Sequence, residues 1–465
     1  MAQMLASVSA LLISVALLIL GHGLQSTLLP LAASNADFSD LQIGAISSAY
    51  FIGLVLGCLG APLVIMRAGH IRAYAAVVSL MSAAAILHPI AVDPVAWFAI
   101  RIISGFCLAG FYMIVESWLN ESATNENRGT IMSTYVVILF AAMMVGQVSI
   151  SGMDITSFIP FAIASVTVSL AVIPVALTSA NQPAPITLVR FRPIKLYRNS
   201  PAALVGALLI GVANGAIWSL SPLYGSQIGF STNESAVYAA AVIAGGMLSQ
   251  WPVGRLSDRM DRRLVLLMLG VATSVVATGV AVLAPQDFQT ATALAMLIGI
   301  CSQPGYAIAV SHAFDYADSE DFVETSSGLL LAFGLGSVAG PISASILMNQ
   351  TGPSGLYFLV AVVNVVMVAF ILTRLFARSA IDPEEKFDFE YAATAQVGTV
   401  MSPEPLDVDA PNVIPPEEFP AYDDEIYNAE TDTITEEVVA YEDLEEAAAE
   451  EEPGKTDDAA TSDKG

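Results

Sequence analysis

Long apolar segments alternate with short polar stretches along the first 376 residues of the chain. A bilayer core about 30 Å thick is crossed by roughly 20 apolar residues in a helix. Segments of this kind occur twelve times, so the pattern predicts an all-α integral membrane protein with twelve transmembrane helices. We place them near residues 5–32, 40–66, 72–91, 94–118, 129–150, 157–179, 200–225, 233–254, 263–284, 288–313, 324–348 and 354–376.

Composition supports this interpretation and adds a second region. Of the 465 residues, 55% are hydrophobic and only 13% are charged, with a mean hydropathy of +0.66, whereas soluble domains carry about 25% charged residues. The net charge of −26 is concentrated in the tail, residues 380–465, which holds 27 acidic and 3 basic residues, a net −24. The remainder is nearly neutral and has no basic surface for nucleic acid. We expect the acidic tail to be disordered, either as a solvated extension or as a binding segment for a protein partner.

The distribution of basic residues predicts an orientation. The cations fall in alternate loops, starting with the second, while the opposite loops carry only acids. Because basic loops stay cytoplasmic, both termini and the 181–199 linker are expected on the cytoplasmic side. The acids of the opposite loops are Asp37, Asp40, Asp93, Asp154, Glu234 and Asp287.

The two halves of the membrane region also repeat. The segment PLVIMRAGHIR at 62–72 follows the second span, and GRLSDRMDRR at 254–263 follows the eighth. Such a repeat is typical of transporters built from two homologous bundles. We therefore expect pseudo-symmetric six-helix bundles at 1–180 and 200–379, a basic linker at 181–199 and the tail at 380–465.

These features resemble the major facilitator superfamily (MFS). The segment 254–263 is similar to its G-x-L-x-D-R-x-G-R-R motif, with Asp261 at the second glycine, whereas the first-half copy has Met66 at the aspartate position. ESWLN at 116–120, the stretch 304–315 and SSGLLL at 326–331 are similar to the bacterial YcaD-like branch. The resemblance implies the MFS fold and solute transport by alternating access.

Arg101 is the leading candidate for chemistry. It lies about seven residues, or ~10 Å, inside the fourth span, and His22 and Gln25 of the first span lie at a similar depth. In the superfamily, the fourth-helix arginine faces the central cavity and is linked to substrate or proton coupling. Arg101 and His22 are therefore candidates for binding an anion or coupling protons, with Gln25 beside them. The alternatives are a structural clamp between spans one and four for Arg101, and a packing role for His22.

Charged residues near the cytoplasmic helix ends are candidates for a gate or an anchor. We predict an ion pair between Glu116, at the end of span four, and Arg128, at the start of span five. As a gate, this ion pair would break when the two halves move against each other during transport. The alternative is a permanent ion pair that anchors the ends of the loop. The other members of this set are Arg67, Arg72, Gly254, Asp258, Arg259, Arg262, Arg263, His312 and Asp315.

Polar and aromatic residues at mid-membrane are candidates for the cavity wall. In membrane helices such groups also serve merely to link neighbouring helices, and both interpretations remain open. The candidates are Gln147, Asn214, Trp218, Gln303 and Tyr306.

The sequence thus predicts a secondary active transporter of the bacterial inner membrane, moving a small solute and coupled to protons. It has no phosphate-binding loop and no metal-spaced Cys/His cluster, so neither an enzyme nor a cofactor is expected. The alternative is a transporter-like membrane sensor or scaffold that acts through its acidic tail.

Overall fold

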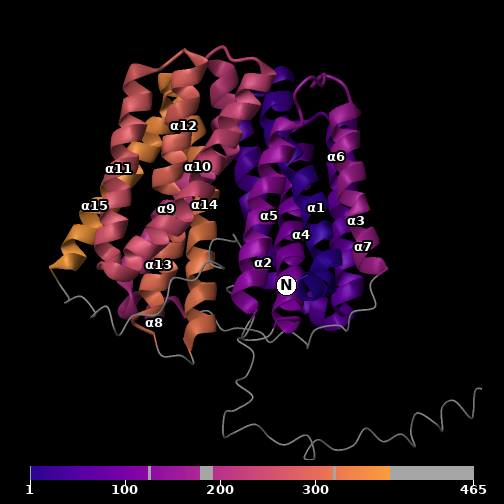
Figure 1. Ribbon diagram of the computed structural model, residues 1–465. Coiled ribbons are helices and arrows are strands. Elements are labelled where there is room, and N and C mark those ends of the chain that lie inside the picture. The colour runs from indigo at the N-terminus through magenta and orange to yellow at the C-terminus, as the bar shows by residue number, and fades with distance from the viewer. Residues whose placement is uncertain (1, 124–126, 178–191, 318–320, 377–465) are drawn as a thin grey trace, which may run out of the picture. The chain divides into compact units, whose positions relative to one another are not determined.

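The computed structural model describes residues 2–123, 127–177, 192–317 and 321–376 as helices joined by short loops (Figure 1). Residues 181–191 of the predicted linker and the predicted acidic tail, 380–465, lie outside the described residues. The helices are α1 (Ala2–Asn35), α2 (Asp40–Ala68), α3 (His70–Ile90), α4 (Pro94–Glu121), α5 (Arg128–Val148), α6 (Ile159–Leu170), α7 (Val172–Ala176), α8 (Pro193–Asn199), α9 (Pro201–Gln227), α10 (Thr232–Arg259), α11 (Arg262–Leu283), α12 (Phe288–Ser302), α13 (Gly305–Phe314), α14 (Phe322–Thr351) and α15 (Gly355–Leu375).

The predicted number of spans is confirmed. Within the described ranges, 12 helical segments are long and apolar enough to cross a membrane. The sixth span combines α6 with α7, and the tenth combines α12 with α13. Each of these breaks lies near a proline, Pro174 or Pro304, which has no backbone N–H to continue the helical hydrogen bonding. Large apolar side chains face outward from mid-span, among them Val275 at 66% and Val166 at 57% exposure, as a lipid-facing surface requires.

The two halves begin corresponding helices with the same capping chemistry. At the start of α2, Ser39 and Gln42 form a reciprocal capping box, and Ser231 and Glu234 form one at the start of α10. Such a box satisfies backbone N–H groups that have no partner inside the helix. The sequence repeat is therefore also a repeat of local structure.

Close helix crossings repeat in the same way. A Cβ atom on Gly53 of α2 would overlap the backbone of Ile102 in α4, and one on Gly105 of α4 would overlap the backbone of Tyr50. In the second half, Gly245 of α10 and Gly299 of α12 make the equivalent crossing. Glycine lets two membrane helices approach to backbone contact, so these positions determine how α4 is rotated against α2.

The halves meet through α2 against α14, α5 against α10, and α1 against α9. Figure 1 shows the first-half helices, α1–α7, beside the second-half helices, α9–α15. At the end where α2 and α10 begin, Gln227 donates a hydrogen bond to Asp40 (2.8 Å), and the backbone of Gly152 donates one to Asn233 (3.0 Å). At that end, polar contacts therefore join the two halves.

Candidate functional site

A cavity of about 100 Å³ lies between the two halves. Helices α1, α2, α4 and α5 supply most of its wall, and α9 and α10 supply the rest. Its polar and aromatic wall residues are His22, Gln25, Ser26, Ser47, Tyr50, Phe51, Arg101, Tyr112, Phe140, Trp218 and Ser219. The sequence candidates Arg101, His22, Gln25 and Trp218 are therefore brought together around one space.

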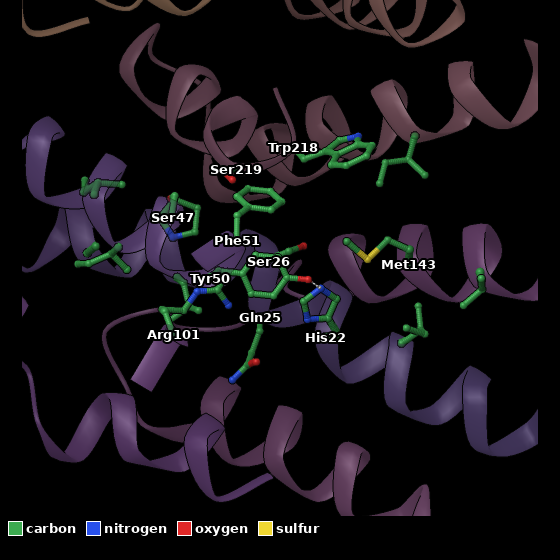
Figure 2. A pocket seen from close by; sticks show the side chains of 18 of the residues that line it. His22, Gln25, Ser26, Ser47, Tyr50, Phe51, Arg101, Met143, Trp218 and Ser219 are labelled. Atoms are coloured by element: carbon green, nitrogen blue, oxygen red, sulfur yellow. Dashed lines mark hydrogen bonds between the residues drawn. The ribbon is translucent and has the colours of Figure 1, made fainter. Parts of the chain in front are cut away.

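Tyr50 of α2 lies at the centre of the polar group, as Figure 2 shows. The guanidinium carbon of Arg101 is 4.2 Å from the centroid of the Tyr50 ring, a cation–π contact. The Tyr50 hydroxyl lies 3.3 Å from Nε2 of His22, whose ring stacks on that of Tyr50 with centroids 5.5 Å apart. Arg101 and His22 are thus linked through Tyr50. Sequence reasoning missed this tyrosine, and the only available signal was a polar-tipped aromatic ring inside span two.

The helix crossing explains why Arg101 meets Tyr50. Gly105 packs directly on the Tyr50 carbonyl, and Arg101 lies one helical turn before Gly105 on α4. The close approach of the two backbones therefore holds the guanidinium over the tyrosine ring.

Several polar atoms of this group have no hydrogen-bond partner among the described residues. They are Nη1 of Arg101, Nδ1 of His22 and both amide atoms of Gln25. These side chains are only 8%, 6% and 1% exposed, in that order, and buried polar groups are normally hydrogen-bonded. The wall carries no acidic residue, and Arg101 forms no ion pair within the described part of the chain. The site is therefore cationic and retains unused hydrogen-bonding capacity.

The other cavity candidates lie elsewhere. Gln147 approaches Ser26 of the wall at 3.4 Å, and Asn214 lines a second, smaller cavity inside the second half. The ring of Tyr306 packs on Phe333, with centroids 4.7 Å apart. Gln303, only 8% exposed, packs against Gly246 instead. Of the five candidates, Trp218 is the one on the wall of the large cavity.

The predicted ion pair between Glu116 and Arg128 is not formed in this structure. Glu116 is fully buried, and its Oε1 accepts a hydrogen bond from the Tyr135 hydroxyl at 2.7 Å. Its Oε2 has no partner among the described residues. Arg128 begins α5 and is partly exposed, whereas Tyr135 lies two turns further along and faces α4. Tyr112, which lines the cavity, lies one turn before Glu116, so Glu116 is one helical turn along α4 from a residue of the cavity wall.

The second-half motif forms a buried network around Arg262. The Arg262 side chain is 0% exposed and donates from Nε to Asp315 at 2.8 Å. Its Nη1 donates to Ser257 at 3.2 Å and to Asp258 at 3.3 Å. The network thereby joins α10 and α11 to the end of α13, with Asp258 bound to Arg262, while Arg259 is exposed.

The departure from the motif at Asp261 has a structural explanation. Asp261 caps α11 by accepting from the backbone N–H of Arg263 (2.9 Å), and it also accepts from the Arg263 side chain (2.7 Å). Partial burial alone would raise the pKa of Asp261, but these hydrogen bonds to Arg263 outweigh it, so that pKa is lowered. Asp261 therefore stabilises the loop between α10 and α11.

The remaining candidates for the cytoplasmic gate or anchor show how the two halves differ. Gly254 and His312 are buried, and the His312 ring contacts Tyr316 with centroids 5.1 Å apart. Arg67 and Arg72 are exposed and form no ion pair within the described ranges. The first-half loop has no aspartate at Met66, so it does not build the counterpart of the Arg262 network.

Comparisons with known proteins agree with the fold. The sequence model of the Major Facilitator Superfamily matches residues 11–287 and 243–406. An "Uncharacterized MFS-type transporter" of Yersinia pestis (strain Pestoides F) is 30% identical over 352 residues, 75% of this chain and 91% of the relative. The "Uncharacterized MFS-type transporter YcaD" of Escherichia coli O45:K1 (strain S88 / ExPEC) is 28% identical over 378 residues, 78% of this chain and 95% of the relative.

Solved structures show the same architecture. A mutant form of the nucleoside transporter NupG superposes with a TM-score of 0.68 at 15% identity, covering 79% of this chain and 99% of that one. A D-xylose-proton symporter superposes with a TM-score of 0.60 at 13% identity, covering 81% and 98%. With twelve spans, a central cavity and a family match across most of its length, the chain belongs to the Major Facilitator Superfamily of membrane transporters.

Proposed function

We propose that the protein is a secondary active transporter that carries a small solute across the bacterial cytoplasmic membrane by alternating access, coupled to protons. The observation that carries this proposal is the cavity, because both halves contribute to its wall, and polar atoms of Arg101, His22 and Gln25 have no hydrogen-bond partner among the described residues. Movement of one half against the other would open such a cavity to one side of the membrane at a time.

We also propose that both termini lie in the cytoplasm. The basic loops support this orientation. In addition, Lys195 of α8 binds both carboxylate oxygens of Asp321 at 2.7 Å, and Arg192 lies 3.7 Å from Glu324 at the start of α14. The basic linker therefore shares one end of the bundle with the loop before α14, as the alternation of loops requires.

Two observations support proton coupling. His22, whose imidazole ring can take up and release a proton, contacts Tyr50 in the cavity wall. Glu116 is a fully buried carboxyl group next to the wall, with a tyrosine hydroxyl as its hydrogen-bond donor. Ionisable groups inside a membrane protein commonly form proton pathways. One of the solved structures with this fold is named a D-xylose-proton symporter. Proton coupling is therefore compatible with this architecture.

The proposal is tested with the full-length protein in liposomes loaded with a pH-sensitive dye. D-xylose, uridine and a series of short carboxylates, amides and amines are added outside under an imposed pH gradient. We expect at least one solute to move protons in protein-containing liposomes but not in empty ones. Arg101→Ala should lower that flux at least tenfold, and Arg255→Gln should preserve it, because Arg255 is an exposed arginine over the Trp251 ring, outside the cavity. Unchanged coupled flux in Arg101→Ala would refute the role given to Arg101.

The acidic tail offers a further control. Under this proposal, a chain truncated after residue 379 still transports the solute. Loss of transport on truncation would instead support a function that depends on the tail.

A further inference from the structure

We infer that the solute is a small monoanion, namely an organic carboxylate with a compact apolar body, bound by Arg101. This inference rests on the proposed transport function and specifies its substrate class. It follows from the charge, the hydrogen-bonding groups and the size of the cavity.

The charge of the cavity wall selects an anion. Arg101 is 8% exposed and lines the cavity, while none of the wall residues is acidic. A guanidinium stays protonated in proteins, and a buried charge without a counter-charge is costly. The cation–π contact with Tyr50 offsets part of this cost and leaves the positive charge uncancelled. Among the described residues Arg101 has no counter-charge, and this one cation in the wall calls for one negative charge in the ligand.

The hydrogen-bonding groups suit a carboxylate. Arginine presents five N–H donors in a planar fork that matches the two oxygens of a carboxylate. The same wall holds Gln25, whose amide nitrogen has no hydrogen-bond partner among the described residues, and the Tyr50 hydroxyl. A carboxylate accepts about four hydrogen bonds, so Arg101 and these neighbours can satisfy it while filling their own unused capacity.

The rest of the wall suits an apolar body. Leu139, Phe140 and Ile243 also line the cavity, as does Phe51, whose ring packs edge-on against Tyr50 with centroids 5.1 Å apart. Trp218 of α9 lies across the cavity from Arg101 (Figure 2). The volume of about 100 Å³ is of the order of the roughly 150 Å³ engineered cavity that binds benzene in another protein. The ligand body is therefore about the size of a phenyl ring or a short alkyl chain.

Other ligand classes fit less well. An organic cation would meet the unpaired Arg101, and like charges repel strongly where the dielectric is low. A neutral polyol would leave that charge uncompensated and place hydroxyl groups against the apolar wall. An inorganic anion such as chloride would satisfy Arg101 but leave the apolar part of the cavity unfilled.

The test compares matched ligands on the purified full-length protein. Benzoate, phenylacetate and hexanoate are each compared with the corresponding primary amide and primary amine, and with chloride, at constant ionic strength in a sulfonate buffer. Binding is followed by isothermal titration and by the shift in Tm, because a ligand that binds the folded state stabilises it by mass action. We expect at least one carboxylate to bind and raise Tm, while its amide and its amine do not.

Variants then assign the binding to the site. Arg101→Gln should weaken carboxylate binding by about 10- to 100-fold, the range for losing hydrogen bonds to a charged group. Arg101→Lys keeps the charge without the fork and should retain a preference for carboxylate over amide. The matched control is Arg255→Gln, which removes an arginine from an exposed aromatic contact and should leave binding unchanged. If Arg101→Gln does not fold, the comparison of carboxylate with amide on the wild-type protein still decides the matter.

Different outcomes contradict different claims. An amide or amine that binds as well as its carboxylate overturns the inference, and so does chloride if it binds as tightly as the best carboxylate. A neutral solute that is transported through Arg101 also overturns it, but leaves the proposed function intact. Conversely, carboxylate binding without flux under any imposed gradient contradicts the transport function and not the anion site.

Discussion

Substitution of Arg262 tests whether the second-half motif is held together by its buried ion pair. The Arg262 side chain is 0% exposed and that of Asp315 is 3%, with 2.8 Å between Nε and the carboxylate oxygen. Removing one member of a buried pair typically costs about 3–5 kcal/mol, since the other charge loses the attraction of this partner in a low-dielectric site. We therefore expect Arg262→Met to lower the free energy of unfolding by about 3–5 kcal/mol.

Exposure makes the neighbouring pair much weaker. Asp258 lies 3.3 Å from Arg262, but its side chain is 34% exposed, and exposed i,i+4 pairs contribute only about 0.3–0.5 kcal/mol. Asp258→Asn should therefore cost less than about 1 kcal/mol. Arg259→Gln is the matched arginine control, because Arg259 is exposed at the end of α10 and surface substitutions usually change stability by about 0.5 kcal/mol or less.

A double-mutant cycle separates the pair from other losses. Replacing both members, as Arg262→Met with Asp315→Leu, removes the buried charges together and should recover most of the stability lost in the single variant. Unfolding is followed by denaturant titration in detergent with intrinsic fluorescence, at one protein and detergent concentration. A cost below about 1 kcal/mol for Arg262→Met, or a double variant as unstable as the sum of both singles, would contradict this account of the network.

Two further predictions concern helix packing and pH. Gly105→Ala should lower the free energy of unfolding by about 1–3 kcal/mol, because the added methyl group would overlap the backbone of α2. Gly206→Ala is the control, because a Cβ atom there meets no atom within 4 Å. Equal effects of the two substitutions in thermal unfolding would argue against a tight crossing. Hydrogen bonds from Arg263 lower the pKa of Asp261. The Asp261 carboxylate therefore stabilises the fold fully at pH values above the ordinary aspartate pKa of about 3.9. This stabilisation is lost as the pH falls through the lowered pKa. The Tm difference between wild type and Asp261→Asn should thus be largest near pH 7 and shrink below about pH 4, and a difference that stays constant over this range would exclude the proposed stabilisation.

Much of the fold could be predicted because span formation depends on local properties of the chain. Apolar length, polar interruptions and the capping residues at Ser39 and Ser231 determine where helices lie, and twelve spans were expected and observed. The depth of Arg101 and His22 within their spans is equally local, and it indicated that the two side chains could lie near one another.

The sequence could not predict which side of each helix is turned toward its neighbours. Amphipathic periodicity marks the buried face of a helix in water, whereas the spans here are apolar all round, so the sequence did not show that Trp218 lines the large cavity while Gln303 packs against Gly246. Nor did it show that Glu116 pairs with Tyr135 rather than Arg128. Both outcomes depend on how neighbouring helices are rotated against each other.

The sequence by itself therefore determined the membrane class, the number of spans, the twofold repeat and the charged residues placed at membrane depth. Only the tertiary structure decided which of those residues meet. The crossing of α2 and α4 at Gly53 and Gly105 places Arg101 over Tyr50 at the cavity, where its charge has no counter-charge among the described residues. The physical reason is that backbone contact at glycine determines helix rotation, and helix rotation determines which side chains share one cavity.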